Sequence, residues 1–230
     1  MDSLTTNPVA ETLQRLFTEA ETTDRHLLSE WTDKAESSSA VISELLDAEA
    51  KDYQGFYQQL SQHFLSVSPE FGRFLYVCAR ACGARSIVEF GTSFGVSTIH
   101  LAAAVRDNSG GRVISTELEP TKAARAHENL QAATMADLVD IRVGDALDTL
   151  RYDLDDTIDL VLLDGAFSLY RPVLDLLHPH LRSGALVIGE NAFEEAGDYL
   201  DYVRNPENGY LSLPLPFDQQ RHNELSLRTR

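Results

Sequence analysis

One short segment combines glycines with acidic and hydroxyl residues, reading Glu-x-Gly-x-x-x-Gly-x-Ser from Glu89 to Ser97. The apolar residues around Glu89 predict a short buried strand, and the glycines predict a tight turn into a helix that begins near Gly95. Glycine allows the backbone to approach a ligand closely. The first turn of a helix offers free N–H groups and the positive end of the helix dipole. The segment is therefore expected to bind a nucleotide.

The residues between the two glycines indicate which kind of nucleotide the segment is expected to bind. Ser93 stands where the fingerprint of dinucleotide-binding folds has a glycine, so a closely approaching pyrophosphate is not supported. A side chain at Gly91 is expected either to enter the space of the ligand or to require a backbone conformation that favours glycine.

Acidic residues follow the next predicted strands, and ligands of open parallel sheets bind beyond the carboxyl ends of the strands. Glu117 stands at the end of the strand predicted over 112–118 and could accept the two hydroxyls of a ribose. Glu119 is the alternative, although an acid at that position also suits the first turn of the following helix. Asp145 follows the strand predicted over 139–143 and could receive the amino group of an adenine.

From Ser86 onward the sequence alternates between strand and helix patterns, which predicts a parallel sheet with right-handed crossovers. The predicted strands cover 86–90, 112–118, 139–143, 158–164 and 184–190, and the predicted helices cover 95–106, 121–133, 168–180 and 193–203. Two final strands, 210–215 and 224–228, have no helix between them and predict an antiparallel hairpin at the sheet edge. The expected fold class is α/β, with seven strands that are mostly parallel.

The first part of the chain shows helical periodicity and no strand pattern. The expected helices cover 11–31, 41–64 and 68–83, after a loose tail over 1–7. We therefore expect an N-terminal helical extension or cap over 1–66 and a second domain over 67–230.

The pattern from Glu89 to Ser97 resembles motif I of class I S-adenosylmethionine-dependent methyltransferases. The resemblance implies a Rossmann-like sheet of seven strands that ends in an antiparallel hairpin, with S-adenosylmethionine as the cofactor. The residues that this resemblance would place around the cofactor are Val67, Glu89, Gly91, Ser97, Glu117, Leu118, Asp145, Ala146 and Asp164.

Residues outside motif I are similar to those of the catechol and caffeoyl-CoA O-methyltransferases. The segment that begins at Val67 looks like the helix before motif I in that group, with Gly72 at the matching spacing. Asp164 after the fourth strand, and Glu190 and Asn191 after the fifth, match the positions that bind one magnesium ion there. The resemblance implies methyl transfer to a phenolic or enolic hydroxyl of a small acceptor, with Asp164 and Asn191 as catalytic residues.

Two departures from that group leave alternatives open. The second metal position holds Glu190 instead of aspartate, and magnesium demands strict geometry. No lysine closely follows Asp164, where the group carries a general base. The reaction could use Mg²⁺ or another divalent cation at Asp164, Glu190 and Asn191, or it could be a metal-independent methyl transfer to nitrogen or another acceptor. A cofactor-binding protein that has lost catalysis is the third alternative.

The chain is acidic, with 36 acidic and 19 basic residues among 230 and a formal net charge of -17. Such a surface repels polyphosphates, so neither a nucleic acid nor an anionic membrane is expected as a partner. The sequence has no signal peptide pattern, no apolar run long enough to span a membrane and only two cysteines, which suits a cytoplasmic protein. The expected partners are a small-molecule acceptor and a second copy of the chain in a homodimer.

Overall fold

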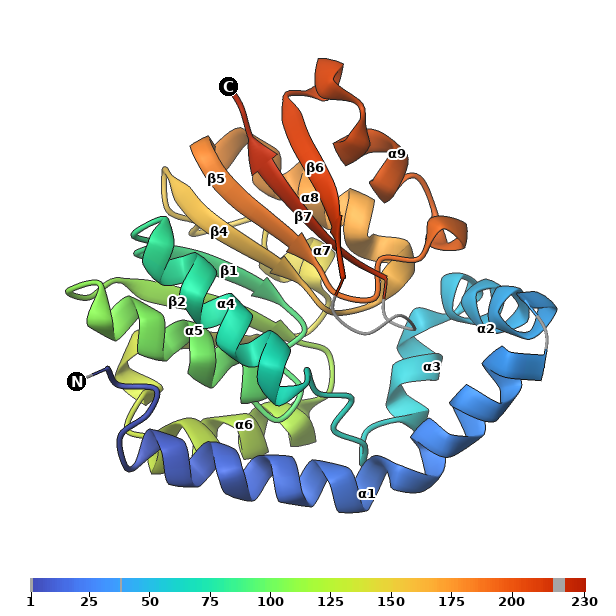
Figure 1. Cartoon of the computed structure of the whole chain (residues 1–230), viewed down its shortest axis with the longest axis horizontal. Coiled ribbons are helices and arrows are strands. Elements are labelled where there is room, and N and C mark those ends of the chain that lie inside the picture. The colour runs from blue at the N-terminus through green and yellow to red at the C-terminus, as the bar shows by residue number, and fades with distance from the viewer. Residues whose placement is uncertain (1, 38, 217–221) are drawn as a thin grey trace.

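A seven-stranded sheet forms the centre of the protein, in a computed structural model that describes residues 2–37, 39–216 and 222–230. The strand order is β3-β2-β1-β4-β5-β7-β6, and helices cover both faces of the sheet (Figure 1). The strands are β1 Ser86–Phe90, β2 Arg112–Glu117, β3 Val139–Val143, β4 Ile158–Leu163, β5 Leu181–Gly189, β6 Tyr210–Leu215 and β7 Asn223–Arg228. Strands β1 to β5 are parallel, whereas β7 pairs antiparallel with β5 and β6. The predicted α/β fold class with an antiparallel final hairpin is confirmed.

An N-terminal arm, residues 9–59, consists of α1 Val9–Ser37, α2 Ser39–Lys51 and α3 Tyr53–Gln59. The single helix predicted over 41–64 is wrong, because the chain leaves the helical conformation at Asp52, with φ -151°. The Asp52 carboxylate accepts the backbone N–H of Gly55 at 3.0 Å and caps α3. The predicted loose tail is also wrong, because the N–H and hydroxyl of Ser3 donate to Asp107 at 2.8 and 2.6 Å.

The remaining helices are α4 Pro69–Ala81, α5 Val96–Asp107, α6 Pro120–Ala132, α7 Ala146–Thr149, α8 Tyr170–Leu177 and α9 Tyr199–Arg204. Neighbouring residues of a strand point to opposite faces of the sheet. In β1, Ile87 belongs to an apolar cluster with residues of α4 and α5, whereas Val88 belongs to a cluster with residues of α8 and α9. The helix predicted over 193–203 is shorter than expected, because Gly197, at φ 124°, separates a 3-10 turn at Glu194–Ala196 from α9.

The N-terminal arm extends from the sheet face that α4 and α5 cover to the carboxyl ends of the strands. The first half of α1 buries Val9, Leu13 and Leu16 in the same apolar cluster as α4 and α5. Beyond this cluster α1 continues, and α2 and α3 turn back toward the carboxyl ends of β4 and β5 (Figure 1). Ligands of this type of sheet bind at those ends. Among the residues that the structure describes, no helix combines the length and the apolar character needed to cross a bilayer.

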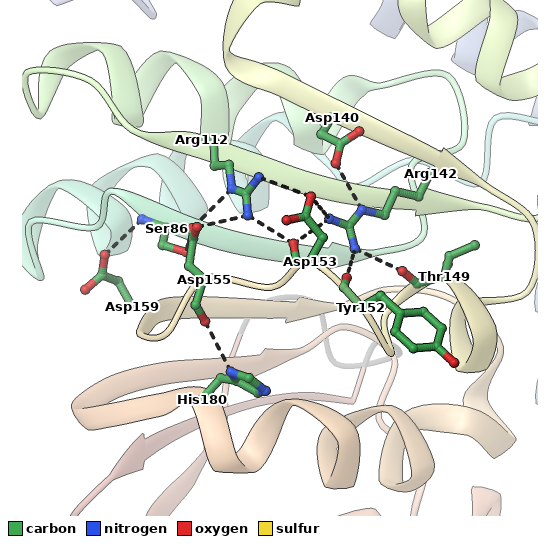
Figure 2. Close-up of polar contacts among 10 residues, drawn as sticks. All are labelled: Ser86, Arg112, Asp140, Arg142, Thr149, Tyr152, Asp153, Asp155, Asp159 and His180. Atoms are coloured by element: carbon green, nitrogen blue, oxygen red, sulfur yellow. Dashed lines mark hydrogen bonds and ion pairs between the residues drawn. The ribbon is translucent and has the colours of Figure 1, made fainter.

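The connection from α7 to β4 is tied to the sheet by two arginines (Figure 2). Arg112 pairs with Asp155 at 2.9 Å, and Arg142 donates to the carbonyls of Thr149 and Tyr152 at 2.9 and 2.7 Å. Because Arg112 begins β2, its ion pair lies toward the amino ends of the strands. Arg142 lies one residue before the end of β3, so the network fixes this irregular connection to both β2 and β3.

Candidate cofactor and acceptor site

The glycine turn, residues 91–95, contains two glycines with positive φ angles. Gly91 has φ 106°, and Gly95, the N-cap of α5, has φ 87°. The N–H groups of Gly91 and Thr92 both donate to the carbonyl of Thr116, at 3.2 and 2.9 Å, which joins the turn to β2. The segment therefore forms the predicted strand-turn-helix unit, with the N-terminus of α5 at the carboxyl edge of the sheet.

Glu89 is fully buried in β1, before this turn. Its Oε2 accepts hydrogen bonds from the hydroxyls of Thr98 and Ser115, at 2.5 and 2.6 Å. Its Oε1 is buried and has no partner with hydrogen-bond geometry among the described residues. Burial raises the pKa of Glu89 to about 7, although the hydroxyls of Ser115, Ser97 and Thr98 lower it. A buried carboxylate oxygen without a partner fits a ligand that brings a donor, such as an ammonium group.

Glu117 is held at the end of β2 by backbone N–H groups on both sides. Its Oε2 accepts from Ser93 at 2.6 Å, and its Oε1 accepts from Glu119 at 2.9 Å. Each oxygen keeps a free lone pair, so the carboxylate can accept two further hydroxyls. Burial raises the pKa of Glu117, which the Glu119 N–H and the Lys122 ammonium counteract. Glu119 itself begins α6 as its N-cap, and Leu118 between the two acids is half-buried, so the geometry favours Glu117 for a ribose.

Asp145 is already engaged on both carboxylate oxygens. Its Oδ1 accepts the N–H of Leu147 at 2.8 Å and caps α7. Its Oδ2 accepts the hydroxyl of Tyr53 at 2.5 Å and the amide of Gln54 at 3.2 Å, both from α3. Ala146, the other residue expected near an adenine, is buried at the start of α7. No motif in the sequence marks Tyr53 or Gln54, so their contact with Asp145 was not predicted.

Val67 and Gly72, which flank the start of α4, are both packing residues. Val67 is 3% exposed and belongs to the same apolar cluster as Phe94 of the glycine turn. A Cβ at Gly72 would lie 2.6 Å from the ring of His100, so the glycine allows α4 to approach α5. Burial lowers the pKa of His100 to about 4, so this ring is neutral at pH 7.

Asp164 and Glu190 follow adjacent strands at the same edge of the sheet. The N–H of Asp164 donates to the carbonyl of Phe90, the last residue of β1, at 2.8 Å. The N–H of Glu190 donates to the carbonyl of Leu163, the last residue of β4, at 2.9 Å. The structure therefore places the two carboxylates that were expected to bind a metal ion at neighbouring strand ends, next to the glycine turn.

Asn191, the third residue of the predicted metal-binding set, is turned toward Glu190. Its amide nitrogen donates to Glu190 Oε2, and its backbone N–H donates to Asn223 Oδ1 at 2.9 Å. Asn191 has φ 50°, a left-handed conformation that asparagine tolerates. Within residues 2–37, 39–216 and 222–230, no group of three or more His, Cys, Asp or Glu side chains could hold a metal ion. Two carboxylates and an amide nevertheless fit Mg²⁺ in chemical type, because Mg²⁺ prefers oxygen ligands.

The N-terminal arm brings two further polar residues to this edge. Glu49 of α2 is 1% exposed and accepts the N–H and the hydroxyl of Ser168 at 3.3 and 3.2 Å. Tyr57 of α3 donates to the carbonyl of Gly165 at 3.3 Å. Burial, followed by the charges of Glu49 and of the two carboxylates at the strand ends, raises the pKa of Tyr57. Neither residue was predicted. The available signal was that position 49 falls on the apolar face of a predicted helix.

Aromatic residues follow Asp164 and Glu190 in the sequence, each three positions later. Phe167, shortly after Asp164, packs edge-to-face on Phe193 with ring centroids 5.3 Å apart. The ring of Phe193 lies 5.5 Å from that of the exposed His222, again between centroids. Such a row of rings suits the binding of a flat apolar ring.

Comparison with known proteins identifies relatives of this chain. Residues 88–192 match a protein family described as a methyltransferase domain. The chain is 34% identical to a catechol O-methyltransferase of Niastella koreensis over 140 residues, 60% of this chain and 62% of that protein. It is 36% identical to a catechol O-methyltransferase of Mycobacterium tuberculosis over 133 residues, 58% of this chain and 60% of that protein. The chain thus spans about three fifths of the length of these curated relatives.

Solved structures share the fold over a larger part of the chain. A cofactor-bound protein from MTB has a TM-score of 0.67 at 27% identity, covering 78% of this chain and 89% of the other. An O-methyltransferase from Bacillus cereus in complex with SAH also has a TM-score of 0.67, at 23% identity, covering 80% of this chain and 90% of the other. By its fold, its matched domain and these relatives, the chain is similar to the class I S-adenosylmethionine-dependent methyltransferases, and to the O-methyltransferases among them.

Proposed function

We propose that this protein transfers a methyl group from S-adenosylmethionine to a phenolic or enolic hydroxyl of a small acceptor. The observation that carries the proposal is the placement of two pairs of carboxylates at one edge of the sheet. Glu89 and Glu117 flank the glycine turn, and Asp164 and Glu190 follow the neighbouring strands β4 and β5. A cofactor at the turn and an acceptor beside Asp164 would therefore be neighbours.

The residues around the glycine turn would bind and orient the cofactor. S-adenosylmethionine supplies an electrophilic methyl group on its sulfonium sulfur. Glu89 Oε1 would accept a hydrogen bond from the methionine ammonium, and Glu117 would accept the ribose hydroxyls. Asp145 would accept the adenine amino group at Oδ2, either together with the Tyr53 hydroxyl or after this hydroxyl has left the oxygen. The proposed contact set is completed by Val67, Gly91, Ser97, Leu118, Ala146 and Asp164.

The residues after β4 and β5 would orient the acceptor hydroxyl. Asp164, Glu190 and Asn191 would hold Mg²⁺ or another divalent cation, which favours the deprotonated form of a bound hydroxyl. Phe167 and Phe193 would position an aromatic ring. Holding the hydroxyl oxygen in line with the methyl group would supply a large part of the rate enhancement. Asp164 and Asn191 are the residues that we propose as catalytic.

Two other functions are suggested by the positions at which this sequence differs from the catechol and caffeoyl-CoA O-methyltransferases. No lysine closely follows Asp164, and Glu190 replaces an aspartate. These residues would suit a metal-independent transfer to nitrogen or another acceptor, in which Asp164 accepts the proton directly. They would also suit a cofactor-binding protein without catalysis.

A two-step experiment separates these functions. Calorimetry with S-adenosylhomocysteine and with NAD comes first, and binding of the former alone is expected. Acceptor panels of catechols and of aromatic amines are then compared with and without a chelator. Methylation of catechols that stops with chelator supports the proposal, whereas chelator-resistant transfer or transfer to nitrogen supports the metal-independent reaction. Cofactor binding without any transfer supports the loss of catalysis, and absence of cofactor binding contradicts all three.

The acidic charge and the cysteines bear on the surroundings of the protein. A net charge of -17 disfavours nucleic acids and anionic membranes as partners. Cys78 and Cys82 are free thiols whose pKa burial raises, which suits a reducing compartment such as the cytoplasm. We propose a cytoplasmic homodimer, and light scattering of the purified protein tests the dimer.

A further inference from the structure

A polar cluster is formed by Ser93 of the glycine turn and the buried residues Asp24, Glu117 and Lys122. Asp24 of α1 is 2% exposed and Lys122 of α6 is 4% exposed. Lys122 donates to the Ser93 hydroxyl at 3.4 Å, and burial lowers its pKa while the charges of Glu117 and Asp24 raise it. Burying charged groups is costly unless they are paired, so the contacts within this cluster need an explanation.

Asp24 binds the segment between α3 and α4 with both carboxylate oxygens. Its Oδ1 accepts the N–H of Phe64 at 3.0 Å, and its Oδ2 accepts the N–H of Leu65 at 2.7 Å. The Nδ1 atom of His63 lies 3.1 Å from Oδ1. Leu65 has φ 49°, a left-handed conformation that is unfavourable for leucine and needs support from its surroundings. The Asp24 carboxylate supplies that support for segment 63–65.

The same segment is bonded to the glycine turn. The carbonyl of Phe64 accepts the hydroxyl of Ser93 at 2.5 Å, and the rings of Phe64 and Phe94 lie 4.4 Å apart between centroids. Ser93, which has φ 47°, donates its N–H to Glu117 at 2.6 Å. A continuous series of contacts therefore connects Asp24, through Phe64 and Ser93, to Glu117.

We propose that Asp24 is a positioning residue for the cofactor pocket. By fixing segment 63–65 it holds Ser93, and Ser93 holds the Glu117 carboxylate where it can accept hydroxyls. The inference rests on the proposed function, because it concerns affinity for the proposed cofactor. It gives α1 a role in cofactor binding, in addition to the cover that α2 and α3 provide over the strand ends.

Asp24→Asn tests the proposal because it preserves the shape of the side chain and removes one of its two acceptors. One of the N–H groups of Phe64 and Leu65 then loses its partner. In the ligand-free variant we expect faster amide hydrogen exchange at Phe64, Leu65 and Ser93. In calorimetry we expect the Kd for S-adenosylhomocysteine to rise by about tenfold or more, the cost of a lost buried hydrogen bond. Asp24→Glu keeps both acceptors and should recover part of the affinity.

Two matched variants of the same helix serve as controls. Glu21 is exposed and faces Arg25 at 3.8 Å, so Glu21→Gln should leave both the exchange rates and the Kd at wild-type values. Leu13 is buried in the apolar cluster, so Leu13→Ala should lower the Tm and leave the Kd unchanged. If Asp24→Asn lowers the Tm as Leu13→Ala does and keeps the wild-type Kd, Asp24 is purely structural and the inference is wrong.

Ser93→Ala tests the same contacts from the other side if Asp24→Asn does not fold. It removes the hydroxyl that donates to Phe64 and leaves α1 intact. A higher Kd of Ser93→Ala for S-adenosylhomocysteine supports the inference, and an unchanged Kd overturns it. Wild-type protein that fails to bind S-adenosylhomocysteine would contradict the proposed function instead, so the two failures are distinguishable.

Discussion

Gly91 packs so closely on Asp164 that a Cβ at position 91 would lie 2.1 Å from the Asp164 carbonyl oxygen. β1 and β4 are neighbours in the sheet, and the N–H of Asp164 donates to Phe90, the residue before Gly91, at 2.8 Å. The direction of a side chain at Gly91 is therefore occupied by protein backbone and not by a ligand, and the φ of 106° confirms the alternative expectation, a backbone conformation that favours glycine. This contact joins the glycine turn to the residue that follows β4, the two parts of the proposed site.

Gly91→Ala should destabilise the whole fold in addition to any loss of cofactor binding. The atoms in contact belong to the backbone, and the φ of 106° is unfavourable for alanine, so neither problem can be relieved by moving a side chain. We expect the Tm measured by circular dichroism to fall by about 10 °C or more.

Gly95→Ala is the matched control for this variant. Gly95 also has a positive φ, 87°, but its Cβ would meet the nearest atom, on Ala126, at an ordinary 3.5 Å. Only backbone strain then acts, and the Tm should fall by a few degrees. Equal stability of the two variants would contradict the close contact between Gly91 and Asp164.

Tyr53→Phe should strengthen the binding of S-adenosylhomocysteine. The Tyr53 hydroxyl donates to Asp145 Oδ2 at 2.5 Å, at the acceptor that an adenine amino group would use. Removing the hydroxyl leaves Oδ2 with only the Gln54 amide, at 3.2 Å, and keeps the ring, so we expect the Kd from calorimetry to fall severalfold. Tyr152→Phe, at a tyrosine that is 75% exposed, should leave the Kd unchanged. Weaker binding by Tyr53→Phe would instead make the hydroxyl part of the adenine site.

The stability of the ligand-free protein should depend on pH through Glu89. Burial raises its pKa from 4.5 to about 7, so the folded state binds this proton more tightly than the unfolded state does. The resulting stabilisation is complete below pH 4.5 and is lost as the pH rises to about 7. Its upper limit is about 3 kcal/mol. Urea unfolding at a series of pH values measures this slope, and Glu89→Gln should remove it.

The pH dependence of stability has to be compared between wild type and Glu89→Gln, because His100 titrates in an overlapping pH range. Burial lowers the pKa of His100 from 6.5 to about 4, so its contribution to stability is present above pH 6.5 and is lost as the pH falls to about 4. The two groups thus act in opposite directions over overlapping ranges. The difference in free energy of unfolding between wild type and Glu89→Gln isolates the carboxyl. A difference that does not vary with pH would show that Glu89 does not titrate in this range.

Activity should require a divalent cation held by the acids after β4 and β5. Exhaustive chelation should remove methyl transfer, added Mg²⁺ should restore it, and Asp164→Asn should lower the rate by about a hundredfold or more at any Mg²⁺ concentration. Asp156→Asn, at an exposed acid, is the control and should behave as wild type. Full activity after chelation would exclude the metal requirement and make Asp164 the candidate acceptor of the hydroxyl proton.

The sheet and the glycine turn could be predicted because their signals are local. Strand residues such as those around Ile87 alternate between two buried faces, and the two glycines mark a turn where positive φ angles are needed. The topology then brings residues after each strand to one edge, which is why Glu117 and Asp164 were expected near the turn.

The contacts of the N-terminal arm could not be predicted, because they join residues far apart in the sequence without a motif. The bond between Tyr53 and Asp145 depends on how α3 packs, and the break before α3 depends on a single capping side chain, Asp52. Asp24 and Glu49 fall on the apolar faces of predicted helices, but which groups they bond becomes visible only in the fold that buries them. Their importance follows from tertiary packing, which helical periodicity alone does not encode.

Transfer of a methyl group to oxygen is tested most directly by incubating the protein with isotopically labelled S-adenosylmethionine, catechol and Mg²⁺ and identifying the product by mass spectrometry and NMR. We predict a catechol monomethyl ether with the label on its new O-methyl group, formed in equal amount to S-adenosylhomocysteine. Tight binding of S-adenosylhomocysteine without labelled product from any catechol, or a label attached to a ring carbon, would contradict an O-methyltransferase.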